Sequence, residues 1–246
     1  MLEGRYPSNS PSYRISGKRG GSGGIIPPDG VWGNIPKKQK TRMRNCTATD
    51  PRAAFFDERA AGWEERCYPP AARERVEALV REFPIMQGHV ILDMGAGTGI
   101  LGPYLRERCG AEGVIVSMDI SFEMIRYASQ KPAYSPGLAM QASAMNLPFK
   151  NAVFDAVICF AAFPHFSDKP RALAEMHRVL RPHGRLCIAH LFSREELARH
   201  HGGHPAVAHD TLPGEGELVR IFEDAGFSAP VVVDIPGRFL ATVTKE

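Results

Sequence analysis

Short apolar runs alternate with amphipathic stretches along the chain from about residue 50 onward. Apolar positions three and four residues apart predict helices at 52–63, 71–83, 101–108, 122–130, 169–180, 193–200 and 215–225. The short apolar runs predict strands at 89–93, 114–119, 138–141, 152–160, 185–190, 231–234 and 239–244. From the first strand to the fifth, strands alternate with helices, except that no helix is predicted between 138–141 and 152–160. This alternation predicts an α/β fold with a parallel sheet covered by helices on both faces.

The last two strands are connected differently from the others. The short connection between 231–234 and the final run contains Pro236-Gly237, and this dipeptide is a hairpin signal. Two strands joined so tightly are antiparallel. The pattern therefore predicts a mostly parallel sheet that includes an antiparallel final strand.

The first 50 residues have a different composition from the rest. They are rich in Gly, Pro and Ser, and they hold nine Lys/Arg against three Asp/Glu. Such a composition predicts a disordered basic extension at 1–50, followed by one folded domain at 51–246. A nucleic-acid or membrane-surface arm is the functional alternative. We prefer the plain extension, with Met43 as the natural start.

The clearest chemical signal is a glycine-rich turn after the first strand. That strand ends in Asp93, and the turn reads Gly95-Ala-Gly97-Thr-Gly99. Alternating glycines allow a tight turn and let a ligand approach bare backbone. Asp119 ends the next strand about 20 residues later, the spacing at which a carboxylate reaches a ribose diol. A nucleoside-containing cofactor is therefore expected.

The spacing of the glycines indicates which cofactor. Dinucleotide folds favour G-x-G-x-x-G, with a pyrophosphate at the helix N-terminus. Here the spacing is G-x-G-x-G, and Asp93 would repel a pyrophosphate but suits the ammonium group of a methionine moiety. The motif resembles motif I of the class I S-adenosylmethionine (SAM) methyltransferases. A nicotinamide or flavin enzyme and an ordinary strand–turn–helix are the alternatives.

The resemblance extends over about residues 50–246. It rests on Leu147-Pro-Phe149, on the apolar run 154–160, and on the helix, turn and strand at 175–189. The pattern is closest to the small-molecule branch that includes the ubiquinone and menaquinone C-methyltransferases. It implies a Rossmann-like three-layer α/β/α sandwich with a seven-stranded sheet, SAM as the cofactor and a small-molecule acceptor. Phe55, Phe56, Trp63 and Tyr68 would belong to a lid, or pack as ordinary core residues.

Motif matches and strand ends together give the expected cofactor-binding residues. They are Asp93, Gly95, Ala96, Gly97, Gly99, Asp119, Ile120, Ser143, Ala144 and Phe160. One position departs from the family pattern, because Ser143 stands where the family has an Asp that accepts from the adenine amino group. A hydroxyl accepts more weakly than a carboxylate. Adenine binding would then depend more on the apolar Ile120, Met145 and Leu147.

Histidines are the candidates for the chemical step. Methyl transfer is an in-line displacement, and a base is needed only if the acceptor must lose a proton. His165 follows the fourth strand and His190 ends the fifth, so both are candidate catalytic residues. A structural role competes for each. The segment 190–209 reads as a polar substrate cap; a metal site of His200, His201 and His204 with His209 or Asp210 is the alternative, and no metal is predicted.

Composition limits the partners and the compartment. Residues 51–246 hold 21 basic and 24 acidic residues, which argues against a nucleic acid substrate. The five cysteines are scattered and odd in number, as expected of reduced thiols in a cytoplasmic protein. No apolar run approaches the length of a membrane span, so stable membrane insertion is not expected. A quinone-type enzyme at the membrane surface and a non-catalytic SAM-binding protein are the alternative functions, and the sequence specifies no oligomeric state.

Overall fold

The computed structural model describes residues 50–134, 138–203 and 207–246. Apart from Asp50, the predicted disordered extension at 1–50 lies outside the described residues. The helices are α1 Pro51–Asp57, α2 Trp63–Cys67, α3 Pro70–Val80, α4 Gly102–Cys109, α5 Phe122–Ala128, α6 Lys169–Val179, α7 Arg194–Gly202 and α8 Glu215–Asp224, with a short 3₁₀ turn, η1, at Phe163–His165. The strands are β1 Val90–Met94, β2 Val114–Asp119, β3 Ala139–Gln141, β4 Phe154–Phe160, β5 Leu180–His190, β6 Val231–Ile235 and β7 Arg238–Thr244.

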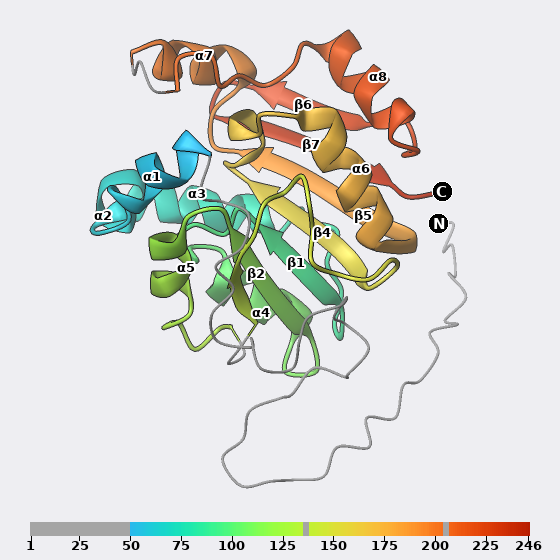
Figure 1. The fold of residues 1–246 in the computed structure, drawn as a ribbon, viewed down its shortest axis with the longest axis horizontal. Coiled ribbons are helices and arrows are strands. Elements are labelled where there is room, and N and C mark those ends of the chain that lie inside the picture. The colour runs from blue at the N-terminus through green and yellow to red at the C-terminus, as the bar shows by residue number, and fades with distance from the viewer. Residues whose placement is uncertain (1–49, 135–137, 204–206) are drawn as a thin grey trace, which may run out of the picture.

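The strands form one seven-stranded sheet in the order β3-β2-β1-β4-β5-β7-β6 (Figure 1). β7 is inserted between β5 and β6 and is antiparallel to both. The pairs from β3 through β5 are parallel. The predicted α/β fold and the antiparallel final strand are therefore confirmed. The order reverses beside β1, so the carboxyl ends of β1 and β4 flank the switch point at which ligands collect in such sheets.

Two apolar clusters lie on opposite faces of the sheet. One joins the sheet to α6, α7 and α8 through buried residues such as Met176, Leu197 and Phe222. The other joins it to α3, α4 and α5 through Leu79, Leu105 and Ala128. Successive β4 residues alternate between the two clusters, as the two-residue period of a strand requires. The two clusters thus hold three layers together, with helices on each side of the sheet, as in the predicted sandwich.

The predicted helix at 52–63 is in fact two short helices. α1 ends at Asp57, and α2 begins at Trp63 after Gly62, whose φ is +65°. That left-handed conformation costs glycine little, so the chain turns there instead of continuing the helix. α1 lies beside α5, on the opposite side of the view from α6 (Figure 1).

The fifth strand begins earlier than predicted, at residue 180 rather than 185. The pairing of β4 with β5 shifts between Phe154↔Leu180 and Ala156↔Arg185, so β5 carries an irregular insertion. His183 within it has a φ of +62°. Such a bulge interrupts the apolar pattern, which is why the sequence predicts only the second half. Within the described residues, no helix is long and apolar enough to cross a membrane.

Candidate active site

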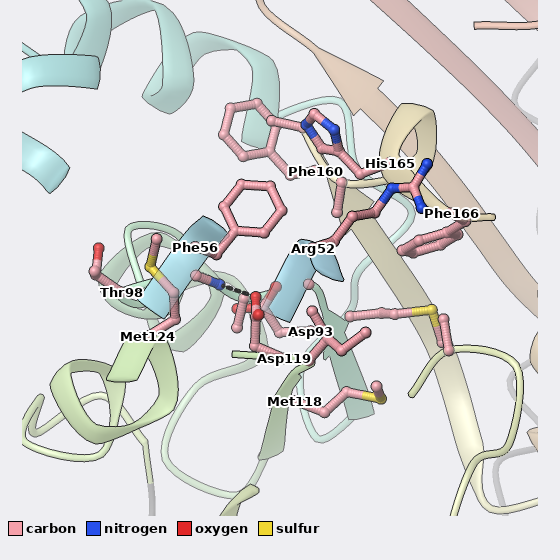
Figure 2. Close-up of a pocket in the computed structure, with 18 of the residues that line it drawn as sticks. Arg52, Phe56, Asp93, Thr98, Met118, Asp119, Met124, Phe160, His165 and Phe166 are labelled. Atoms are coloured by element: carbon pink, nitrogen blue, oxygen red, sulfur yellow. Dashed lines mark hydrogen bonds between the residues drawn. The ribbon is translucent and has the colours of Figure 1, made fainter. Parts of the chain in front are cut away.

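A pocket of about 940 Å³, including its open mouth, lies at the carboxyl ends of β1, β2 and β4 (Figure 2). Among the expected cofactor residues, Asp93, Gly95, Ala96, Gly97, Asp119, Ile120, Ala144 and Phe160 line it. Gly99 and Ser143 do not. Of the two candidate catalytic histidines, the pocket wall includes His165 and not His190.

The glycine turn presents backbone to this pocket. Gly95 and Gly97 have φ values of +70° and +55°. A side chain at Gly95 would collide with the Cβ of Ala162 at 2.3 Å. At Gly97 an added Cβ would meet no described atom within 4 Å, so the space over this residue opens into the pocket. The turn can therefore hold a ligand against bare backbone at Gly97.

Gly99 has another role, which is packing. A Cβ there would lie 2.7 Å from the ring of Tyr134 and 3.2 Å from Ala128. Tyr134 occupies the space that a side chain at Gly99 would need. The third glycine of the motif thus allows close helix packing.

Asp119 is fixed between two backbone donors. Its Oδ2 accepts from the Gly97 N–H at 2.9 Å (Figure 2). Its Oδ1 accepts from the Ser121 N–H at 2.9 Å. Burial raises the pKa of Asp119 to about 6, although these backbone hydrogen bonds lower it. A carboxylate has about four lone-pair sites, so two hydroxyl donors can still be accepted. The geometry suits a ribose diol.

Asp93 is almost fully enclosed, at 1% exposure. Its Oδ2 accepts from the Tyr134 hydroxyl at 2.7 Å. Burial raises the pKa of Asp93 to about 7, against the lowering effect of that hydrogen bond. A carboxyl with this pKa is readily ionised by an adjacent cation. The arrangement fits an ammonium group bound at this end of the turn.

Ser143 points elsewhere than expected for an adenine acceptor. Its hydroxyl accepts from the Met145 N–H at 3.3 Å within a local turn. The adjoining pocket wall is apolar and is built from Met118, Ile120 and Met145. This wall would give a flat base an apolar surface, and the Ser143 hydroxyl donates to the sulfur of Met145 at 3.9 Å.

His165 stands at the end of η1, directly after β4. Lys169 donates to the carbonyls of Pro164 and Phe166 and thereby fixes this turn. The His165 Nδ1 lies 2.8 Å from Oδ2 of Asp210, a residue of the loop between α7 and α8. Asp210 also accepts from Arg52 Nη2 at 2.9 Å. The two hydrogen bonds lower the pKa of Asp210 to about 2, although burial would raise it.

His190 is enclosed by protein rather than by the pocket, with 9% of the residue exposed. Its Nδ1 accepts from the Phe192 N–H at 3.0 Å, and its ring stacks on Phe192. Burial lowers the pKa of His190 to about 3. A neutral ring that accepts at Nδ1 carries its proton on Nε2 and has no lone pair left for a substrate. The geometry favours a structural role for His190.

Where the structure describes them, the other histidines of the His-rich segment are not gathered into a metal site. Within residues 50–134, 138–203 and 207–246, no group of three or more His, Cys, Asp or Glu side chains could hold a metal ion. His201 Nδ1 instead hydrogen-bonds to the backbone carbonyl of Asp210. His204 lies outside the described residues.

The N-terminal helices reach the pocket as a cover. Phe56, Trp63 and Tyr68 line it, whereas Phe55 does not. Glu64 in α2 accepts from the Thr98 hydroxyl at 2.9 Å and pairs with Lys131. Asp57 in α1 accepts from the Glu123 N–H at 3.0 Å, at the start of α5. Two separate contacts thus attach this cover to the cofactor side of the site.

Sequence reasoning missed Arg52, Glu64 and Tyr134, and it considered Asp210 only as a metal ligand. Tyr134 could have been suspected because glycines at 99 and 102 leave room for a large ring. The contact of Asp210 with His165 spans 45 residues of sequence. The periodic patterns of helices and strands predict only local structure, so they could not predict a contact between residues so far apart in the sequence.

Comparisons with known proteins find similarity to methyltransferases. Residues 92–188 match the family model described as a methyltransferase domain. The ubiquinone/menaquinone biosynthesis C-methyltransferase UbiE of Edwardsiella ictaluri is 31% identical over 140 residues, or 55% of this chain and 55% of that protein. The demethylmenaquinone methyltransferase of Thermus thermophilus is 42% identical over 102 residues, 40% of this chain and 45% of the relative. The chain spans about half the length of the curated relatives it matches.

A solved structure extends the likeness to most of the fold. The SAM-dependent methyltransferase from Aquifex aeolicus matches with a TM-score of 0.61 at 24% identity, covering 76% of this chain and 98% of that one. The chain thus shares its fold with that methyltransferase. The predicted resemblance to the class I methyltransferases, and to their quinone C-methyltransferases, is confirmed.

Proposed function

We propose that this chain is a SAM-dependent methyltransferase that acts on a small molecule. The observation that carries the proposal is the hydrogen bond from the Gly97 N–H to Asp119 inside one pocket. This hydrogen bond joins the glycine turn, where a charged amino-acid tail can lie, to the carboxylate that can hold the ribose of a nucleoside. The names of the curated relatives support methylation as the reaction.

The pocket residues fit SAM in chemistry and in space. Asp119 would hold the ribose diol, and Asp93 would face the ammonium group. Met118, Ile120, Ala144 and Met145 would enclose the adenine, and the open space over Gly97 would receive the tail. When bound, SAM supplies a methyl group activated by the positive charge on sulfur.

The chain itself would supply alignment, exclusion of water and a proton acceptor. Phe56, Trp63 and Phe160 give the pocket a largely aromatic wall. Water kept out of a cleft strengthens electrostatic interactions inside it. His165, oriented by Asp210, would take a proton from the acceptor as the new bond to carbon forms.

The acceptor is proposed to be a small molecule rather than a nucleic acid, because the folded part carries a slight excess of acid. A cytoplasmic location is proposed from the cysteines: Cys67, Cys109, Cys159 and Cys187 are free thiols, and the last three are buried. A quinone-type acceptor reached at a membrane surface is the second candidate, and the quinone enzymes among the relatives favour it.

Calorimetry tests the cofactor assignment. Wild-type protein should bind SAM and S-adenosylhomocysteine more tightly than NAD. Asp119→Ala should weaken both ligands by about 1.5–3 kcal/mol, because the diol loses a charged acceptor. The exposed Asp224 on α8 provides a matched control, and Asp224→Ala should leave both affinities unchanged. Tighter binding of NAD, or an unchanged affinity in Asp119→Ala, would overturn the assignment.

A second assay separates an enzyme from a binding protein. Methyl-labelled SAM is incubated with a panel of phenols, quinols, amines and thiols, and transfer of label is measured. Release of labelled product supports the enzyme, and SAM binding without any product supports the binding-only alternative. Co-sedimentation with anionic liposomes, with and without residues 1–42, tests the membrane-surface candidate.

A further inference from the structure

Three distant parts of the chain meet at the carboxylate of Asp210. Arg52 comes from α1, His165 from η1, and Asp210 from the loop before α8. Arg52 Nη2 donates to Oδ1 at 2.9 Å, and His165 Nδ1 lies 2.8 Å from Oδ2. The Asp210 side chain is only 4% exposed. Figure 2 shows Arg52 and His165 together at one end of the pocket, away from Asp93 and Asp119.

The same helix makes a second contact with the His165 ring. Phe56 packs against it edge-on, with ring centroids 5.2 Å apart. Arg52 and Phe56 are four residues apart and therefore lie on one face of α1. The ring of His201 lies 5.1 Å from that of His165. The imidazole is thus confined by neighbours from two other elements.

A carboxylate at one ring nitrogen determines the tautomer of a histidine. An ionised carboxylate only accepts hydrogen bonds, so the neutral ring must carry its proton on Nδ1. The lone pair is then on Nε2, the nitrogen that a substrate can use. Arg52 occupies the other oxygen of Asp210 and offsets its charge.

We propose that Asp210 and Arg52 are positioning residues for His165, and that the docking of α1 on the domain sets this histidine in its proton-accepting tautomer. The inference rests on the proposed function, in which His165 is the base. During the reaction the acceptor's proton passes to Nε2 while the acceptor–carbon bond forms and the carbon–sulfur bond breaks. The imidazolium so formed lies against the Asp210 carboxylate, which remains ionised. α1 therefore both covers the pocket and completes its base.

Nitrogen NMR of the full-length protein tests the tautomer without cofactor or acceptor. With ¹⁵N-labelled histidine, the His165 signals are assigned by their loss in His165→Gln. We expect the Nδ1–H form in the wild-type protein. In Asp210→Asn, Arg52 still donates to the amide oxygen, so the amide NH₂ faces the ring and the Nε2–H form should dominate. Turnover should fall by about 10²–10⁴-fold with SAM affinity unchanged.

Two arginine variants separate positioning from general stability. Arg52→Met frees the Asp210 carboxylate to turn away from the ring. The tautomers should then mix, and turnover should fall by roughly 10–100-fold, as on loss of an orienting partner elsewhere. Arg52→Lys keeps the charge and should recover part of the loss. Arg59→Met is the matched control, because the Arg59 guanidinium contacts the Phe55 carbonyl and Glu58 and not Asp210.

The outcomes are distinct. A wild-type His165 in the Nε2–H form, or an Asp210→Asn protein with wild-type tautomer and turnover, would overturn the inference. An equal effect of Arg59→Met would also overturn it, because the coupling would then not run through Asp210. If the tautomers change as expected but His165→Gln retains full turnover, the proposed base fails while the positioning by Asp210 holds.

Discussion

Asp93 is an ionisable residue enclosed by the fold at the turn after β1. Its only side-chain donor among the described residues is the Tyr134 hydroxyl, which does not compensate fully for burial, and its pKa is raised to about 7. The nearby Asp119, with a pKa of about 6, adds to the raised value. Two carboxyls with raised pKa values in one pocket favour a ligand that carries a positive charge and hydroxyl donors.

We predict that the affinity for SAM rises with pH from about 5.5 to about 8. The ammonium group favours ionised Asp93, so binding at lower pH must expel a proton, and this cost disappears above the pKa of about 7. Calorimetry across this range measures the effect. Asp93→Asn should bind weakly and retain only the dependence near pH 6 that Asp119 causes. An affinity that is flat with pH in the wild-type protein would contradict the prediction.

In the ligand-free protein, the contribution of Asp93 to stability should change with pH in the opposite direction to the SAM affinity. The native pKa of Asp93 lies above the ordinary aspartate value of 3.8, so the native state holds the proton more tightly than the unfolded chain. The contribution of Asp93 to stability therefore falls as pH rises from about 4 to about 7. Asp93→Asn should melt higher than wild type at pH 8 and lose that advantage at pH 4. Equal shifts in melting temperature at both pH values would refute this assignment.

The two candidate histidines can be separated by mutation. His165→Ala should lower turnover by about 10²–10⁴-fold and leave SAM affinity intact, because His165 contacts Asp210 and the acceptor end of the pocket. His190→Ala should mainly reduce stability, because its ring packs on Phe192 outside the pocket. Normal turnover in His165→Ala would mean that the acceptor needs no base from the protein.

At the scale of elements, the chain pattern predicted the sheet more closely than the site. Alternating runs identify β1, β2 and β4, and Pro236-Gly237 identifies the hairpin of β6 and β7, because these signals are local. The break at Gly62 was not predicted, because the residues around it have a helical pattern and the break depends on the left-handed backbone conformation of Gly62. Ser143 was predicted near the cofactor because it follows the end of a strand. The orientation of its hydroxyl is determined by the local turn, in which it accepts from the Met145 N–H.

The cover formed by α1 and α2 should control how fast the cofactor leaves. Thr98 in the glycine turn donates to Glu64 in α2 at 2.9 Å. Thr98→Val removes this donor and keeps the shape, at a cost of about 0.5–1.5 kcal/mol to the closed state. Stopped-flow measurement should show SAM dissociating roughly 2–12-fold faster, with little change in association. Ser228→Ala, remote from the pocket at the start of the C-terminal strands, should leave the dissociation rate unchanged.

For the whole molecule, the charge is unevenly distributed. Residues 1–50 hold nine basic and three acidic side chains, whereas 51–246 hold 21 and 24. The only described residue of the first segment, Asp50, caps α1 by accepting from the Arg52 N–H at 2.9 Å. We propose that the boundary between extension and domain lies before this cap rather than after residue 50.

Two truncations locate that boundary. Deleting residues 1–42 should leave the melting temperature and SAM affinity nearly unchanged, because a segment of this composition is not expected to contribute to the core. Deleting residues 1–53 also removes the Asp50 cap and the Arg52–Asp210 ion pair. Loss of the cap alone costs about 1 kcal/mol, or about 2–4 °C in a domain of this size, and the unpaired Asp210 adds to it. Calorimetric melting of both proteins measures the difference.

A fall of many degrees on deleting residues 1–42 would show that the extension packs on the domain. Equal melting temperatures for the two truncated proteins would show that α1 is not anchored through Arg52.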